Sequence, residues 1–170
     1  MKQLLPSRRF FLASASAVTV LGALAGCGFE LRKAPTFAFK SIAVPGNSAF
    51  VNYLRRNLAA AGTVELIPAA RASEAEAVLD ILGENRDRVV LATNSAGEVR
   101  ELELRLTIRF RLRTPAGKEL LLSEISQKRD LTYNESSALA KDAEAELLFR
   151  DMQNDVAQQM LRRIAAVKAL

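Results

Sequence analysis

A run of strict alternation between apolar and polar residues constrains this chain more than any other feature. The apolar members fall at every second position: Leu102, Leu104, Leu106, Ile108, Phe110 and Leu112. Ionised or hydroxylated residues fill the gaps: Glu101, Glu103, Arg105, Thr107, Arg109, Arg111 and Arg113. Successive side chains of a strand point to opposite faces, so this pattern predicts a long strand with one face in a core and one in polar surroundings.

The segments on either side predict an antiparallel meander. Residues 74–93 form an extended region that ends at the loop 94–97, and residues 118–133 form a returning strand after the turn 114–117. Strands that follow one another through short turns pair antiparallel. An earlier strand is expected over 37–44, before the turn signal Pro45-Gly46.

Two helices are predicted. The first begins after Ser48, a favourable N-cap, and stops at Gly62. The second begins at Ser136 or Ser137 and runs for about 30 residues, or about 45 Å. Its expected apolar stripe is Ala140, Ala143, Leu147, Leu148, Met152, Val156, Met160, Leu161, Ile164 and Val167.

The order β-α-β-β-β-α predicts an α+β fold, a two-layer sandwich of a four-stranded mixed sheet with both helices on one face. A right-handed β-α-β start places the first strand parallel to a neighbour. The expected division of the chain is a cleaved signal peptide over 1–26, a lipidated tether over 27–36 and a single αβ domain over 37–170.

The first 26 residues predict export. They hold Lys2, Arg8 and Arg9, no acidic residue, and an apolar run over 10–24. Arg8-Arg9 fits either a twin-arginine signal or an ordinary basic n-region, and both remain open. Removal of this segment leaves 21 basic and 19 acidic residues, a net charge of +2. Bulk charge therefore gives no case for nucleic-acid binding.

Leu24-Ala25-Gly26-Cys27 predicts a lipidation site. The Cys27 thiol takes a diacylglycerol and the freed amine an N-acyl chain, which together anchor the chain firmly to a membrane. Gly28, where an Asp would favour retention in the inner membrane, predicts delivery to the outer membrane. No other cofactor is expected.

The residue inventory excludes most catalytic chemistry. The sequence has one Cys and no His, so it offers neither a disulfide nor a His-based nucleophile, and the usual soft metal ligands are almost absent. Glu101 and Glu103 are flanked by arginines and fit a charge ladder better than an acid/base pair. We therefore expect that the protein is not an enzyme.

Three motifs together resemble the lipopolysaccharide (LPS)-assembly lipoprotein family LptE. They are Cys27-Gly28-Phe29-Glu30-Leu31-Arg32, Ala138-Leu139-Ala140-Lys141-Asp142, and the pattern from Met152 to Arg163. The resemblance implies an outer-membrane protein that plugs the LptD β-barrel, supports its folding and binds LPS. The chain lacks the long polar C-terminal tail of familiar members. A stand-alone, membrane-anchored periplasmic lipid or glycan carrier is the alternative, and it predicts an apolar cavity between sheet and helices.

The candidate binding residues are cations, because LPS presents phosphates beside acyl chains. Arg105, Arg109, Arg111 and Arg113 share one strand face, although the same face would also arise as a solvated surface paired with Glu84, Asp80 or Glu124. Lys141 opposes the helix dipole in the first turn of the last helix. The resemblance implies a role for Lys141 in LPS binding, and a plain surface lysine is the other interpretation. Arg86 and Arg88 are candidates for contact with a barrel wall.

Overall fold

The computed structural model describes residues 35–169, which lie in one compact unit. The signal segment, the lipidation site at Cys27, the twin-arginine pair and most of the expected tether therefore lie outside the described residues. The strands are β1 (Ser41–Ala43), β2 (Glu65–Ile67), β3 (Ala77–Thr93), β4 (Val99–Arg113) and β5 (Glu119–Thr132). The helices are α2 (Ala49–Ala61), α3 (Ala138–Ala165) and the short 3-10 helices η1 (Ala69–Glu74) and η2 (Glu135–Ser137).

The sheet is mixed, as predicted, but it has five strands rather than four, in the order β2-β1-β3-β4-β5. β1 runs parallel to both β2 and β3, and β3, β4 and β5 form the antiparallel meander. The extra strand β2 is only three residues long, too short to display a period of two. It is fixed by its partner β1, with Leu66 opposite Ile42.

The first strand is shorter than the sequence predicts. Only Ser41–Ala43 pair as a strand, because the Lys40 amide donates to the Glu76 side chain instead of to a neighbouring strand. Upstream, Phe37 and Phe39 stack with their ring centroids 5.2 Å apart, and Phe39 is buried. The two phenylalanines therefore reflect core packing rather than sheet pairing.

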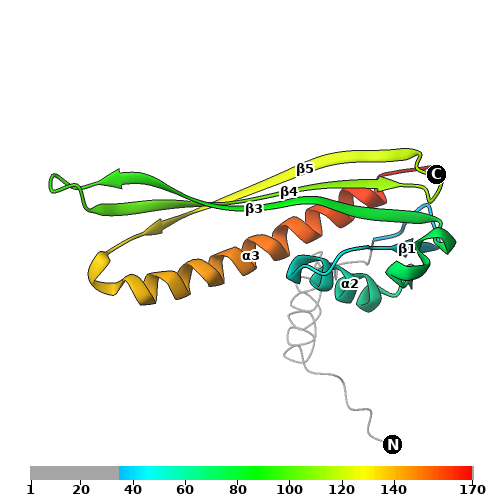
Figure 1. The fold of residues 1–170 in the computed structure, drawn as a ribbon, viewed down its shortest axis with the longest axis horizontal. Helices are drawn as coiled ribbons and strands as arrows, with labels where there is room; N and C mark the ends of the chain where they lie inside the picture. The colour runs from blue at the N-terminus through cyan, green and yellow to red at the C-terminus, as the bar shows by residue number, and fades with distance from the viewer. Residues whose placement is uncertain (1–34, 170) are drawn as a thin grey trace, which may run out of the picture. The chain divides into compact units, whose positions relative to one another are not determined.

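The alternation in β4 is confirmed for its apolar members, and Glu103 is the one polar member that is also buried. Every apolar member from Leu104 to Leu112 is fully buried, and Leu102 nearly so. The two helices lie on this buried face, both on the same side of the sheet (Figure 1). The opposite face of β3, β4 and β5, which we call the outer face, is covered by neither helix.

Helix α2 follows its predicted signals. The Ser48 hydroxyl accepts a hydrogen bond from the Val51 amide at 3.1 Å, and Gly62 ends the helix with a φ of 64°. Its apolar side is buried in the common core through Phe50, Leu54 and Leu58.

The predicted stripe of α3 is correct from Met152 onward and wrong in the first turns. Ala140, Ala143 and Leu147 are exposed, whereas Ala145 and Phe149 are buried. The first half of this helix carries apolar residues on two faces, and only the sheet decides which face is covered. The expected cap also differs: Ser137 makes no side-chain capping bond, and Asn134 instead accepts from the Ser136 amide.

Side chains fill the space between α3 and the sheet. Phe149, Met152, Val156 and Met160 from the helix belong to one buried cluster with the inward side chains of β4. The apolar cavity required by the carrier hypothesis is thus occupied by the core itself. Among residues 35–169, no helix is long and apolar enough to cross a membrane.

Candidate functional site

The four candidate arginines of β4 lie together on the outer face, as their spacing predicts. The register sets Arg111 opposite Asp80 of β3 and Arg109 opposite Glu124 of β5. Acidic side chains from both neighbouring strands therefore share the surface with the arginines. Whether this face is basic depends on how those charges pair.

Asp80 holds two of the arginines. Its carboxylate accepts hydrogen bonds from Arg113 Nε at 2.7 Å and from Arg111 at 3.1 Å. Burial alone would raise the pKa of Asp80, but the hydrogen bonds and positive charges of Arg113 and Arg111 outweigh it and lower that pKa. One carboxylate for two guanidinium groups leaves this cluster with a net positive charge.

Glu103 organises a second cluster further along β4. It is the buried acidic residue of the described domain, only 6% exposed, and its two oxygens accept from Arg105 Nε and from Lys128 Nζ, the latter at 3.1 Å. Hydrogen bonds from Arg105 and Lys128 lower the pKa of Glu103 and outweigh the effect of its desolvation. Here, too, two cations share one carboxylate.

Arg109 lies between the two clusters and differs from the other three arginines. Among residues 35–169 the structure gives it no hydrogen bond and no ion pair. It lines an open pocket of about 230 Å³ together with Leu82, Gly83, Asn85, Thr107 and Glu124. Its guanidinium is therefore the unpaired cation of the β4 set.

The four arginines consequently do not form a continuous basic patch. Asp80, Glu84 and Glu124 are the three acids expected to pair with these arginines, and Asp80 does so. Glu124 lies opposite Arg109 in the register, but among the described residues the structure gives it no ion pair. Glu84 points to the other side of β3, where it accepts from Gln153 of α3 at 3.0 Å. Sequence reasoning missed Lys128. Its pairing with Glu103 depends on the β4–β5 register, which the sequence does not reveal.

Arg86 and Arg88 lie on the helix-facing side of β3, not on the outer face. Arg88 pairs with Asp142 at 2.6 Å, and Arg86 pairs with Glu146 at 3.4 Å. Arg86 also lies over the ring of Phe149, 5.3 Å from its centroid. These contacts join one flank of α3 to β3, so both arginines have partners within the domain; their contact with a barrel wall stays a prediction.

A smaller set of contacts fixes the other flank of α3. Arg129 of β5 pairs with Asp155 at 3.0 Å, and Arg163 donates to the backbone oxygen of Glu124 at 2.8 Å. Lys141 is on this side as well, because 14 residues of helix bring it within about 40° of Asp155. Lys141 pairs with Glu144 at 2.9 Å, and its side chain is 23% exposed.

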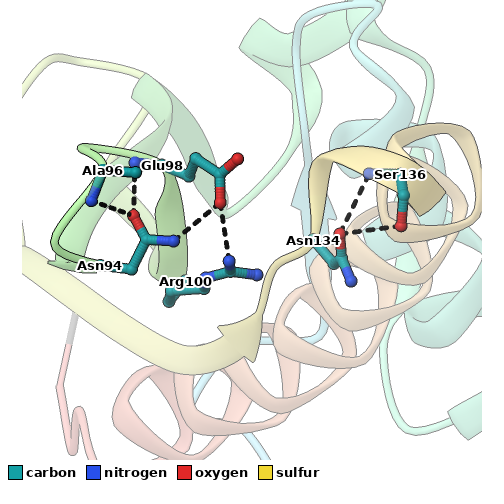
Figure 2. Close-up of polar contacts among 6 residues, drawn as sticks. All are labelled: Asn94, Ala96, Glu98, Arg100, Asn134 and Ser136. Carbon is teal, nitrogen blue, oxygen red and sulfur yellow. Dashed lines mark hydrogen bonds and ion pairs between the residues drawn. The ribbon is translucent and has the colours of Figure 1, made fainter.

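The end of the domain that carries Lys141 is built from two polar turns. In the β3–β4 loop, Asn94 Oδ1 accepts from the amides of Ala96 and Glu98, and the Glu98 carboxylate accepts from Asn94 and Arg100 (Figure 2). In the β5–α3 junction, Asn134 Oδ1 accepts from both the amide and the hydroxyl of Ser136. We call this region, residues 94–98 and 133–141, the distal end.

Exposed apolar side chains gather toward the distal end. Val90 and Leu91 are about half exposed, near the end of β3, and Leu139 is 86% exposed in the first turn of α3. A half-buried lysine therefore shares this end with uncovered apolar surface. The candidate residues thus occupy three separate places: the outer face, the β3 flank of α3, and the distal end.

No metal site is found in the part of the chain that the structure describes, because no three His, Cys, Asp or Glu residues lie close enough there to hold an ion.

The two carboxylates expected to form a charge ladder have different surroundings. Glu103 is buried between two cations, and Glu101 is half-buried opposite Thr132.

Comparison with known sequences connects this domain with LPS assembly. A family model described as "LptE: Lipopolysaccharide-assembly" matches residues 39–164. An LPS-assembly lipoprotein LptE from Yersinia pestis is 27% identical over 150 residues, which are 85% of this chain and 71% of that protein. The Yersinia enterocolitica protein of the same name is 34% identical over 93 residues, 54% of this chain and 44% of its own length.

Solved structures share the fold. The solution structure of an uncharacterized lipoprotein B from Nitrosomonas europaea superposes with a TM-score of 0.69 at 31% identity, covering 82% of this chain and 91% of that one. The crystal structure of the rare lipoprotein B from Shewanella oneidensis gives a TM-score of 0.64 at 24% identity, covering 75% and 95%. The family match spans almost all of the αβ domain described above, with its five-stranded sheet and two covering helices. The chain therefore belongs to the lipopolysaccharide-assembly family LptE.

Proposed function

We propose that this chain is an outer-membrane lipoprotein, acylated at Cys27, that plugs an LptD-type β-barrel and binds LPS on its way to the cell surface. The observation that carries the proposal is the family match over residues 39–164, which covers almost all of the described domain. The proposed role is non-catalytic. It requires a polar surface for the barrel and a cationic, partly apolar surface for the lipid.

The outer face supports the plug role. The lumen of an outer-membrane barrel is polar, so a plug needs a surface that is ionised without strong net charge. The outer face meets this requirement because its cations lie among carboxylates: Asp80 and Glu103 pair with four of them, and Asp87, Glu124 and Asp130 lie on the same face. Apart from Arg109, the arginines of this face would enter a lumen already paired with a carboxylate.

The distal end supports LPS binding. Lys141 supplies a cation there, and Leu139 in the first turn of the same helix is 86% exposed. A phosphate beside acyl chains needs this combination of a charged donor and uncovered apolar surface. The Glu144 carboxylate now holds Lys141, so a phosphate would replace that carboxylate on binding.

Recovery of the full-length lipoprotein from outer membranes tests the plug role. We expect a large β-barrel to co-purify in a one-to-one ratio through high salt. A Cys27→Ala variant should lack the membrane anchor, and much less barrel should co-purify with it. Recovery of the wild-type lipoprotein without any barrel would refute the proposal. Binding of LPS to the detergent-solubilised lipoprotein tests the second role separately.

A further inference from the structure

The outer face has an opening beside Arg109. A β-bulge between Ile81 and Gly83 interrupts the β3–β4 register, and Gly83 is the residue that faces Arg109 across the two strands. A Cβ atom added to Gly83 would meet nothing within 4 Å, so the space there is open. Bulges and glycines inside strands recur where a ligand approaches the backbone.

Arg109 is the group in this opening with unused donors. Its neighbours on β4, Arg105 and Arg111, each hold a carboxylate, while Arg109 has no ion pair among the described residues. A guanidinium offers five donors in a planar fork that suits a phosphate or a carboxylate. The cation is thus available to an outside anion without breaking an internal pair.

The other walls of the pocket suit hydroxyl groups. Asn85 offers an amide, and Thr107 a hydroxyl that already shares a hydrogen bond with Ser126 at 3.1 Å. Glu124 adds an acceptor that would repel a bare anion but accepts from hydroxyls. Leu82, 40% exposed, offers an apolar wall for the carbon face of a ring.

We propose that this pocket binds a phosphorylated sugar, with the phosphate on Arg109 and the ring hydroxyls on Asn85, Thr107 and Glu124. Its volume of about 230 Å³ accommodates a single pyranose. That LPS supplies this phosphorylated sugar rests on the proposed function. The assignment of the pocket itself rests only on the bulge, the open space and the unpaired Arg109.

Three variants of the full-length lipoprotein in detergent test the pocket. Gly83→Val fills the open space, and a β-branched residue suits a strand, so the fold is expected to hold. Arg109→Gln removes the cation. Arg105→Gln is the matched control, because it removes a cation of the same strand that lies outside the pocket. Thermal unfolding of each variant reports on folding, and Gly83→Ala provides a milder filling should Gly83→Val lower the melting temperature.

The probes are glucosamine 1-phosphate, glucosamine, inorganic phosphate and LPS, with binding measured by ligand-observed NMR or calorimetry. We expect Gly83→Val and Arg109→Gln to weaken glucosamine 1-phosphate binding about tenfold or more, and Arg105→Gln to change it little. Glucosamine and inorganic phosphate should bind more weakly than the sugar phosphate.

Three outcomes would overturn the assignment: Gly83→Val binding like the wild type, an equal loss in Arg105→Gln, or inorganic phosphate binding as tightly as the sugar phosphate. The LPS arm separates the two proposals. Sugar-phosphate binding that Gly83→Val abolishes, in a protein that binds neither LPS nor a barrel, would keep the pocket and refute the proposed function.

Discussion

Arg86 of β3 lies over the ring of Phe149 in α3, with its guanidinium carbon 5.3 Å from the ring centroid. Phe149 is otherwise a core residue, 2% exposed, so one aromatic ring joins the apolar core to the ionised flank of the helix. On the same flank of α3, Glu146 forms an ion pair with Arg86, and Asp142 forms one with Arg88. These contacts add to the apolar packing that selects the inward face of α3.

A double-mutant cycle tests this contact. Phe149→Leu should lower the free energy of unfolding by about 1–3 kcal/mol through lost packing. Combined with Arg86→Met, it should reveal a coupling of about 0.5–1 kcal/mol from the cation–π contact. Urea denaturation measures both. The same cycle with Arg129→Met, which lies on the other flank, should be additive, and equal coupling in the two cycles would contradict a specific contact.

Asp80→Asn should destabilise the domain in a pH-dependent way. The folded pKa of Asp80 is lowered, so its contribution to stability is full above the ordinary value of 3.8 and is lost as the pH falls through the folded pKa. We expect a loss of about 1–3 kcal/mol at pH 7, shrinking in acid below the folded pKa. Urea denaturation at several pH values measures it.

The matched control for that experiment is Asp87→Asn. Asp87 is an exposed acid of the same strand, opposite Arg105 in the register, and the structure gives its side chain no ion pair among the described residues. Its replacement should change stability by no more than about 0.5 kcal/mol. A difference between wild type and Asp80→Asn that stays constant from pH 7 to strong acid would show that ionisation is not the cause.

Asn134→Ala should lower stability more than Ser137→Ala. Asn134 caps the turn that leads into α3, accepting from the Ser136 amide at 3.0 Å, and loss of such a cap costs about 1 kcal/mol. Ser137 occupies the position before the helix, but its hydroxyl only donates to the Asn134 carbonyl at 3.3 Å. Melting temperatures of the two variants decide between them, and equal losses would contradict the assignment of the cap.

Lys141→Gln should weaken LPS binding without changing stability appreciably. The Lys141–Glu144 pair is an (i,i+3) pair at the surface, worth only about 0.2–0.5 kcal/mol to the helix. Arg150→Gln is the control, an exposed cation further along α3. Binding of the solubilised lipoprotein to LPS at matched salt measures the effect, and identical affinities of the two variants would reduce Lys141 to a solubilising residue.

Local signals in the sequence were sufficient for several elements. The period of two in β4 determined which of its side chains face the core, because successive side chains of a strand point to opposite faces. Ser48 and Gly62 determined the ends of α2 through bonds and dihedral angles that those residues make themselves. The order of elements, with the rule for β-α-β connections, determined the mixed sheet and its parallel start.

The remaining features depend on partners that are distant in the chain. β2 exists as a strand only because β1 lies beside it, and the face that α3 buries was settled by the sheet beneath it. The sequence of β4 suggests a basic cluster, but its arginines have acidic partners: Asp80 of β3 pairs with Arg111 and Arg113, and Glu103 pairs with Arg105 of its own strand and with Lys128 of β5. Arg109 alone of the four was left beside an opening, because a bulge placed Gly83 across from it. Alternation specifies which side chains share a face, whereas register specifies which of them neutralise one another.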